Sequence, residues 1–352
     1  MSIKRKIYSN KMIKKVGLAV FALGVTLATT FLILNFMVFG KFKLENLNPF
    51  GSAGPISKAI EKIELAKEGD NSKLKAKEIV NILLIGIDRR NKSQTGFNTD
   101  VMILVSIDTQ TKRVLLTSVP RDVWINGNKI NALYTVFGEE TLVDAFEKIT
   151  GQDVDGYIRC DFEDFRWIID AMGGVPIDVE RSFTDNTFPN NSDTAVVSVT
   201  FTQGKETMPG DRALIFARSR KGNNGEGSDL MRAKRQHLIL KGMIEGISQS
   251  KSQFWPMDVD SFFGTVTATG KMLTTLELED IYYLWRFYDE RDQYNIESFV
   301  IGDDYIYHPG LYPASDYHAW VFIPRDPTWT VLHTDIRNKL DGTFVEEMAP
   351  AN

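Results

Sequence analysis

The stretch that decides the fold is IVNILLIGIDRRNKSQTGFNTDVMILVSIDTQTKRVLLTSVPRD, residues 79–122. Residues 79–88 are nearly all aliphatic, as expected for a strand that is buried on both faces. Residues 101–107 and 114–119 form two further hydrophobic runs, and the polar turn 108–112 joins them. Because short connections favour antiparallel neighbours, this stretch predicts three strands in an antiparallel meander.

Charged side chains stand at the ends of these three strands. Asp88 ends the first strand, Asp100 begins the second, and Arg121 follows the end of the third. In an antiparallel meander these three positions lie at the same edge of the sheet. The topology alone therefore predicts that two carboxylates and one guanidinium meet there.

The rest of the chain alternates between helices and strands. Apolar spacing and capping residues predict helices over residues 139–150, 162–172, 209–216, 230–247, 276–288 and 329–340, with Asp229 as the N-cap of the fourth. Short hydrophobic runs predict strands over residues 156–161, 175–179, 195–201, 297–301 and 321–323. This alternation indicates an α/β domain.

The first 40 residues have the pattern of a membrane anchor. Residues 1–15 carry six basic side chains and no acidic one, and residues 16–40 contain no charge. About 20 apolar residues span a bilayer as a helix, and the basic flank stays on the cytoplasmic side. The alternatives are a cleaved signal peptide, which has a shorter apolar region, a soluble core helix, which at this length rarely lacks a polar face, and an interfacial helix. We therefore predict a cytoplasmic tail (1–15), a single transmembrane signal anchor (16–40) and an extracytoplasmic remainder.

That remainder divides into a stalk over residues 41–78 and one domain over residues 79–345. The whole chain has 352 residues, of which 43% are hydrophobic and 25% charged, as is ordinary for a globular protein. A net charge of −5 argues against a nucleic-acid-binding protein, whose domain usually carries a basic surplus. Cys160 is the one cysteine, so an intramolecular disulfide is excluded.

A basic segment, residues 212–241, stands out in this acidic chain. It holds eight basic side chains and two acidic ones. Arg218 and Arg220 are two residues apart, so in an extended segment they point the same way. A solvated basic face and a patch that meets anionic lipid headgroups are the alternative interpretations of such a run.

The predicted helix within this segment presents a second set of polar side chains. Asp229, Arg232 and Gln236 lie on one face, at spacings of three and seven residues, and Arg235 borders that face. Arginine binds phosphate oxygens bidentately. Two guanidiniums from the extended segment and two from the helix therefore suit an anion with several oxygens.

The arginine segment and the meander edge together predict magnesium-dependent pyrophosphate chemistry. Paired carboxylates would repel a phosphate unless a metal lay between them, and Mg²⁺ is held by one or two carboxylates and by substrate oxygens. A glycosidase also uses two carboxylates, but it has no need of four arginines. The chain has no P-loop, GxSxG or HExxH motif, and its four histidines lack metal-ligand spacing.

Several motifs, taken in order along the chain, resemble the LytR–CpsA–Psr family. Residues 81–90, NILLIGIDRR, resemble the opening strand of the family with its Asp-x-Arg end. SVPRD at 118–122, KINA at 129–132 and DAMGGV at 170–175 follow as in the family. The segment 210–236 is similar to the most specific family motif, including ARSR and DLMRAKRQ.

The resemblance implies a three-layer α/β/α fold with a central mixed, largely antiparallel sheet and an apolar cleft for a polyprenyl tail. It implies a Mg²⁺ ion at Asp88 and Asp100. The implied catalytic residues are Asp88, Asp100, Arg121, Arg218 and Arg220. The implied pyrophosphate-binding residues are Arg90, Arg121, Lys129, Arg218, Arg220, Arg232, Arg235 and Gln236.

Members of this family attach teichoic acids, capsular polysaccharides or similar polymers to peptidoglycan through a phosphodiester and release polyprenyl phosphate. We therefore expect a phosphotransferase with a possible pyrophosphatase side activity, and Asp100 is one candidate for its general base. A regulatory or non-catalytic binder of polyprenyl-pyrophosphate glycans is the alternative, as is a transferase that glycosylates surface proteins. A transcriptional role conflicts with the extracytoplasmic domain and its acidic charge.

One position departs from the family pattern. The family usually has arginine two residues before the second aspartate, and this chain has Asn98 there. Asparagine does not supply the positive charge, so we hypothesise that Arg89, Arg90 or Lys92 compensates from the same loop.

Overall fold

The computed structural model describes residues 71–90, 93–94, 96–190, 194–250, 273–310 and 320–345, which all belong to the unit Glu64–Asn352. The predicted cytoplasmic tail, the predicted anchor and most of the predicted stalk lie outside these residues. Among the described helices, none is both long and apolar enough to cross a membrane.

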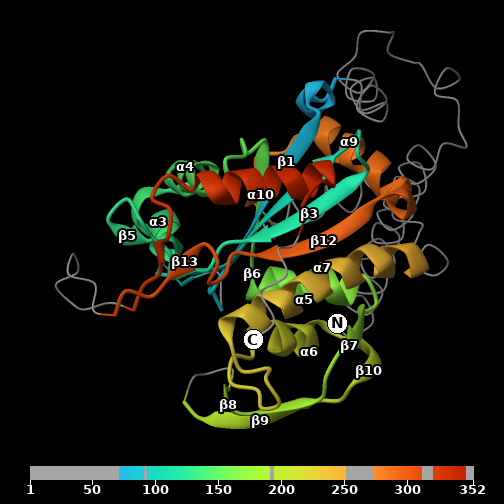
Figure 1. Ribbon diagram of the computed structural model, residues 1–352. Coiled ribbons are helices and arrows are strands. Elements are labelled where there is room, and N and C mark those ends of the chain that lie inside the picture. Colours follow the sequence, from blue (N-terminus) through green and yellow to red (C-terminus); the bar gives the residue numbers. More distant parts are fainter. Residues whose placement is uncertain are drawn as a thin grey trace, which may run out of the picture. The chain divides into compact units, whose positions relative to one another are not determined.

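The predicted antiparallel meander forms the centre of the sheet. β1 (Ile79–Ile87) pairs antiparallel with β2 (Thr99–Asp108), and β2 pairs antiparallel with β3 (Arg113–Ser118). In Figure 1, β1 and β3 run between two groups of helices. The three aliphatic runs therefore form the strands that the sequence predicts.

Three further strands extend the meander on both sides. β6 (Gly156–Asp161) pairs parallel with β1, and β12 (Asn295–Val300) pairs parallel with β3. β11 (Leu273–Thr274) pairs antiparallel with β6, which gives the order β11-β6-β1-β2-β3-β12. Three of the five pairings are antiparallel, so the prediction of a mixed, largely antiparallel sheet is confirmed.

A β-bulge interrupts the β1–β2 ladder beside the charged strand ends. Gly86 pairs with Val101 and the next pair is Ile87 with Thr99, so Asp100 is the extra residue. A Cβ atom on Gly86 would lie 2.8 Å from the Cβ of Val101, so a side chain there would push the strands apart. Bulges re-aim side chains and are common next to active sites. This one takes Asp100 out of the regular alternation of β2.

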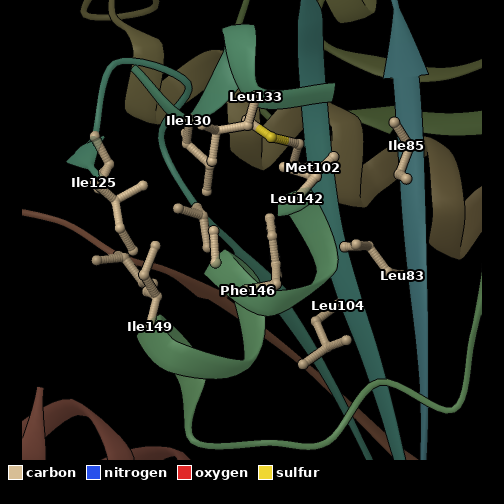
Figure 2. Packing of buried hydrophobic residues seen from close by; sticks show 14 of the residues in the cluster. Leu83, Ile85, Met102, Leu104, Ile125, Ile130, Leu133, Leu142, Phe146 and Ile149 are labelled. Atoms are coloured by element: carbon tan, nitrogen blue, oxygen red, sulfur yellow. The ribbon is translucent and has the colours of Figure 1, made fainter. Parts of the chain in front are cut away.

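Three helices, α3 (Ile130–Phe137), α4 (Glu139–Thr150) and α10 (Thr330–Asp341), pack on one face of the sheet. The core on this face, part of which is drawn in Figure 2, includes Leu83, Ile85, Met102, Leu104, Ile130, Leu133, Leu142, Phe146 and Ile149. Each fully buried aliphatic side chain stabilises the fold by about 1.5–3 kcal/mol. This packing holds the meander in register, since a slip by one residue would turn these side chains to the other face.

The opposite face of β1 packs against α9 (Leu278–Asp289), which the short 3₁₀ helix η3 (Arg291–Gln293) follows. Val80 and Ile82, which alternate along β1 with the residues of the first core, cluster here with Leu74 and Leu276. Leu74 lies in the 3₁₀ helix η2 (Lys73–Ala76), whose N-cap Ser72 donates a hydrogen bond to Asp280. The packed domain therefore begins before Ile79, inside the stretch that we predicted to be stalk.

A second hydrophobic core lies on the side of the sheet that α9 covers. Helix α7 links this core to the central sheet. α7 contacts β12 of the central sheet and also β7 of the second core (Figure 1). The second core joins α5 (Phe162–Ala171), α6 (Gly210–Arg218) and α7 (Asp229–Ser250) to β7 (Val175–Val179), β8 (Phe183–Pro189), β9 (Val196–Phe201) and β10 (Gly204–Met208). The sequence analysis did not predict α3, β8 or β10. With helices on both faces of the sheet, the predicted layered architecture is confirmed.

Candidate active site

A pocket with a volume of about 140 Å³ lies at the ends of β2 and β3. Its charged wall comes from the strand ends and from the first turns of α7, and consists of Asp100, Arg121, Asp122, Asp229, Arg232 and Gln236. Its C-terminal wall consists of Val300, Ile301, Gly302, Asp303, Ile306 and Phe322. The pocket therefore combines residues that are more than 200 positions apart in the sequence.

Asp100 and Arg121 form an ion pair in the charged wall. The Nη1 atom of Arg121 donates to Oδ1 of Asp100 at 2.8 Å, and both side chains are about one-quarter exposed. Burial lowers the pKa of Arg121, but the neighbouring Asp100 and Asp122 carboxylates outweigh it, so that this pKa is raised. The prediction that the meander brings these two residues together is confirmed.

A tight hairpin of β4 (Trp124–Ile125) and β5 (Asn128–Lys129) places Lys129 beside the pocket. Its turn residues Asn126 and Gly127 both have positive φ, 51° and 78°, as an Asn-Gly type I′ turn requires. The turn brings Lys129 Nζ within 2.6 Å of Oδ1 of Asp122. Lys129 thus contacts a residue of the charged wall but does not itself line the pocket.

The first turn of α7 supplies the rest of the charge. The Oγ atom of Ser228 accepts a hydrogen bond from the backbone N–H of Met231 at 3.1 Å, so Ser228 is the cap and the prediction of an Asp229 cap is wrong. As the first helical residue, Asp229 accepts two 3.0 Å hydrogen bonds from the Arg220 fork. Its Oδ1 atom also lies 3.2 Å from Nη2 of Arg232.

The charges in this wall stabilise one another. Burial raises the pKa of Asp229, but Arg232, Arg220 and Arg121 outweigh it, so that this pKa falls below its usual value. Burial lowers the pKa of Arg232, which Asp229 only partly offsets. A phosphate that enters the pocket therefore meets guanidiniums whose orientation the carboxylates already fix.

Arg218 and Arg220 do not point the same way. Arg218 is the last residue of α6 rather than part of an extended segment, because the helix runs further than predicted. Its guanidinium lies 4.4 Å from the ring centroid of Phe162 and 5.5 Å from that of Phe188. Arg220, in contrast, binds Asp229. Neither arginine lines the pocket, and Arg220 joins it through Asp229.

Asp185 of β8 anchors the segment Ser219–Lys221, which contains Arg220. Its Oδ2 atom accepts hydrogen bonds from Ser219 Oγ at 2.8 Å and from the backbone N–H of Lys221 at 3.1 Å. Burial raises the pKa of Asp185, but these hydrogen bonds and those from Thr187 outweigh it, so that this pKa is lowered. The sequence analysis missed Asp185 because nothing in its own strand marks it.

Arg235 is buried and binds other parts of the protein, whereas the sequence analysis predicted that it binds the anion. Its side chain is 2% exposed, and Nη1 bonds the buried Glu226 carboxylate at 2.7 Å. Nε and Nη2 donate to the backbone carbonyls of Phe216 and Ser219. One turn of helix beyond Arg232, this guanidinium therefore fixes α6 and the loop after it against α7.

The two predicted metal-binding residues lie on neighbouring strand ends. The backbone N–H of Asp88 donates to the carbonyl of Asn98 at 2.9 Å, two residues before the bulged Asp100. Within the described ranges, no group of three or more His, Cys, Asp or Glu residues is arranged to hold a metal. Mg²⁺ usually takes one or two protein carboxylates and completes its shell with water and phosphate oxygens. Asp88 directly follows β1 and Asp100 lies in the bulge of the neighbouring strand β2, so the donor chemistry at this edge of the sheet, two carboxylates, is of the kind that Mg²⁺ takes.

The loop beside Asn98 contains two arginines with different partners. Arg89 forks onto Oδ2 of Asp161 at 2.9 and 2.7 Å, and this carboxylate is buried. Arg90 Nε lies 3.9 Å from Oδ1 of Asp88. Lys92 lies outside the described residues. Of the residues predicted to compensate for Asn98, Arg90 is the one seen beside a predicted metal ligand.

A buried serine–histidine pair borders the pocket. The hydroxyl of Ser118, which lines the pocket, lies 2.7 Å from Nε2 of His237. Burial, with a smaller effect from Lys241, lowers the pKa of His237 to about 4. The imidazole is therefore neutral at pH 7, and it packs Ser118 against α7.

A model of the LytR_cpsA_psr family matches residues 51–316, more than half of the chain. The chain belongs to this family. The resemblance drawn from the sequence motifs is thereby confirmed.

Two curated relatives carry the name polyisoprenyl-teichoic acid–peptidoglycan teichoic acid transferase. TagU of Oceanobacillus iheyensis is 30% identical over 217 residues, which cover 58% of this chain and 59% of the relative. TagV of Bacillus subtilis is 29% identical over 212 residues, which cover 56% of this chain and 52% of the relative. The matched part of the chain thus spans between half and three-fifths of these relatives.

Solved structures share the fold. The crystal structure of B. subtilis TagV has a TM-score of 0.56 at 24% identity and covers 75% of this chain and 98% of that one. A structure described as TagT bound to LIIa-WTA has a TM-score of 0.55 at 22% identity, with 75% and 92% coverage. At these identities the likeness shows the architecture of the sheet and its helices.

The C-terminal wall is the part of the site that the sequence analysis missed. Its members are mostly apolar or glycine. They come from the end of β12, from β13 (Ile306–Tyr307) and from the position directly before β14 (Ile323–Pro324). Asp303 is the one charged residue among them, and no motif marks the set. A signal was nevertheless present, because β12 pairs parallel with β3 and so ends at the same edge as Arg121.

Proposed function

We propose that this protein transfers a glycopolymer, with one phosphate, from a polyprenyl-pyrophosphate carrier to a hydroxyl of peptidoglycan. The observation that carries the proposal is the charged wall, in which Arg121 and Arg232 are held by Asp100 and Asp229 around one pocket. The names of the TagU and TagV relatives support the same substrate class.

In the proposed reaction, an acceptor hydroxyl attacks the phosphorus that bears the sugar. A new phosphorus–oxygen bond forms, the bond to the bridging oxygen breaks, and polyprenyl phosphate leaves, while the hydroxyl proton passes to a base. Arg121, Arg232 and Gln236 donate hydrogen bonds to phosphate oxygens as charge develops on them, which is the main catalytic task in phosphoryl transfer. The carboxylates of Asp100 and Asp229 keep the guanidiniums oriented before the substrate arrives.

A magnesium ion is part of the proposal. When bound, Mg²⁺ would neutralise phosphate charge, and Asp88 and Asp100 would hold it. Arg90 contributes positive charge beside Asp88, which is the charge that Asn98 does not supply. Water in place of the acceptor would give the pyrophosphatase side activity.

We also propose that the protein is a single-pass membrane protein with the domain outside the cytoplasm. The uncharged run over residues 16–40 and its basic flank support this topology. The lipid-linked donor would then lie in the same membrane as the anchor. Protease protection in sealed cells would report the side on which the domain lies.

The test uses the full-length chain in detergent with a polyprenyl-pyrophosphate disaccharide and an uncrosslinked peptidoglycan oligomer. Mass spectrometry should find one phosphodiester-linked product and one polyprenyl phosphate per turnover. Chelation of Mg²⁺ or Asp100→Asn should abolish both. Binding of the donor without either product would instead support the regulatory alternative, and full turnover without metal would contradict the metal-dependent mechanism.

A further inference from the structure

An aromatic ledge adjoins the C-terminal wall of the pocket. It consists of Tyr307 and His308, at and after β13 (Ile306–Tyr307), and of Trp320 and Phe322, before β14. The Trp320 side chain is 58% exposed and stacks on His308, with ring centroids 3.6 Å apart and an angle of 29°. Large exposed aromatic surfaces are unusual on a soluble face and mark binding sites.

The ledge is continuous with the pocket. Phe322 lines the pocket and meets Trp320 edge-to-face at 6.3 Å. The backbone N–H of Phe322 donates to the carbonyl of Asp122, and its carbonyl accepts from Trp124. Because Asp122 follows Arg121 directly, the ledge is fixed to the loop that carries a pocket arginine.

The ring orientation in the ledge is set by the protein. His308 Nδ1 lies 2.8 Å from the carbonyl of Val321 and therefore carries the hydrogen, so Nε2 is the other polar atom of the ring. The indole of Trp320 offers an apolar face and one N–H donor. An apolar ring face with polar groups at its rim is the surface that stacks on a sugar ring and bonds its hydroxyls.

Charge around the ledge distinguishes between possible sugars. Segments 302–310 and 320–326 carry three carboxylates, Asp303, Asp304 and Asp326, and one guanidinium, Arg325. Arg325 lies over the ring of Tyr307, at 5.3 Å. This acidic surround repels a phosphate-rich donor chain, whereas an uncharged acceptor sugar meets no such penalty.

We propose that the aromatic ledge is the acceptor subsite, where Trp320 stacks on an N-acetylated hexosamine ring of the peptidoglycan glycan strand. This inference rests on the proposed transferase function. The site then has two distinct parts: the charged wall binds the anionic donor, and the ledge binds an uncharged sugar ring of the acceptor and presents its hydroxyl to the pocket.

The experiment measures KM for donor and acceptor separately with the full-length chain in detergent. Trp320→Ala should raise KM for the peptidoglycan oligomer roughly tenfold, the value of one lost aromatic stack of about 1.4 kcal/mol. Hydrolysis of the donor without acceptor should not change. Trp320→Phe should restore most of the affinity, and Val196→Ala, at a similarly exposed residue on β9, serves as the matched control.

Three outcomes would overturn the inference. In the first, Trp320→Ala raises KM for the donor instead, which would assign the ledge to the donor sugar. In the second, neither KM changes. In the third, Trp320→Ala loses only binding to phospholipid vesicles, which would assign the ledge to the membrane surface. Saturation-transfer NMR with a β-linked N-acetylglucosamine oligomer alone gives a readout without turnover. If the wild-type protein transfers nothing, the proposed function fails, and Trp320-dependent oligomer binding still decides whether the ledge is a sugar site.

Discussion

Helix α7 places two arginines, three residues apart, in regions of opposite kind. Arg232 lines the pocket and shares the carboxylate of Asp229 with Arg220. Arg235 is 2% exposed and holds the buried Glu226. The position of an arginine around the helix axis therefore decides whether its guanidinium is available to a ligand, since the residue type is the same in both cases. The first region is built for chemistry and the second for stability.

The buried region should show the largest effect on stability. Arg235→Met leaves the Glu226 carboxylate buried without a partner, which should lower the free energy of unfolding by about 3–5 kcal/mol. Denaturant unfolding of the variant measures this. Adding Glu226→Gln should recover part of the loss, and a double variant no more stable than Arg235→Met would show that the pair is not the cause.

A substitution in the pocket should instead lower the rate of transfer. Arg121→Ala removes a donor that Asp100 holds beside the phosphate site, and kcat for transfer should fall about 10²- to 10³-fold, as for the loss of one oxyanion donor. The melting temperature should change little, because the side chain is partly exposed. A stability loss as large as that of Arg235→Met, at unchanged kcat, would erase the distinction between the two regions.

His237 of α7 should make the stability of the fold depend on pH. Its pKa is about 4 in the folded chain and 6.5 unfolded, so the unfolded chain binds a proton more readily between these values. Acidification from pH 7 to pH 4 should therefore lower the free energy of unfolding by about 3 kcal/mol through the protonation of His237. Above pH 7 this residue should make the stability no more dependent on pH. His237→Gln should remove that part of the pH dependence of unfolding. An unchanged slope between pH 6.5 and 4 would rule out a neutral buried histidine.

The adjacent pair Arg89 and Arg90 repeats the comparison on a smaller scale. Arg90→Ala should raise KM for the donor about threefold, because it removes one partly exposed charge beside Asp88. Arg89→Ala should leave KM unchanged and lower stability, because it strands the buried Asp161 carboxylate. Paired KM and unfolding measurements on the two variants check this. The reverse assignment would make Arg89 the residue that compensates for Asn98.

Much of the fold could be predicted because local pattern and topology agree. The aliphatic runs of β1, β2 and β3 and the short turn between β2 and β3 favour the antiparallel meander that forms. The elements α4, β6 and β7 match their predicted bounds. β8 and β10 were missed because their burial depends on distant partners. The bulge at Asp100 was missed for a similar reason, since it depends on which residues of β2 face Gly86.

Site residues at strand ends could be predicted, because the topology of the sheet determines where they lie. Site residues on helices could not, because their direction depends on where the helix ends and on how it is rotated. Asp100 and Arg121 meet because antiparallel strands must end together. Arg218 was misplaced because α6 continues by two residues, which turns its side chain onto Phe162. Arg235 was misplaced because a helical residue that borders a face can equally point into the core. The C-terminal wall has one charged residue, Asp303, and no motif that marks it as part of a site.

Donor turnover by two matched variants, Arg232→Lys and Arg235→Lys, tests the central claim most directly. Lysine keeps the charge but not the planar fork of arginine. Measured below both melting temperatures, in detergent with the polyprenyl-pyrophosphate disaccharide, kcat should fall at least tenfold for Arg232→Lys. For Arg235→Lys it should stay near the wild-type value while the melting temperature drops. Loss of kcat at Arg235 with full activity at Arg232 would contradict the assignment of the charged wall as the site of phosphoryl transfer.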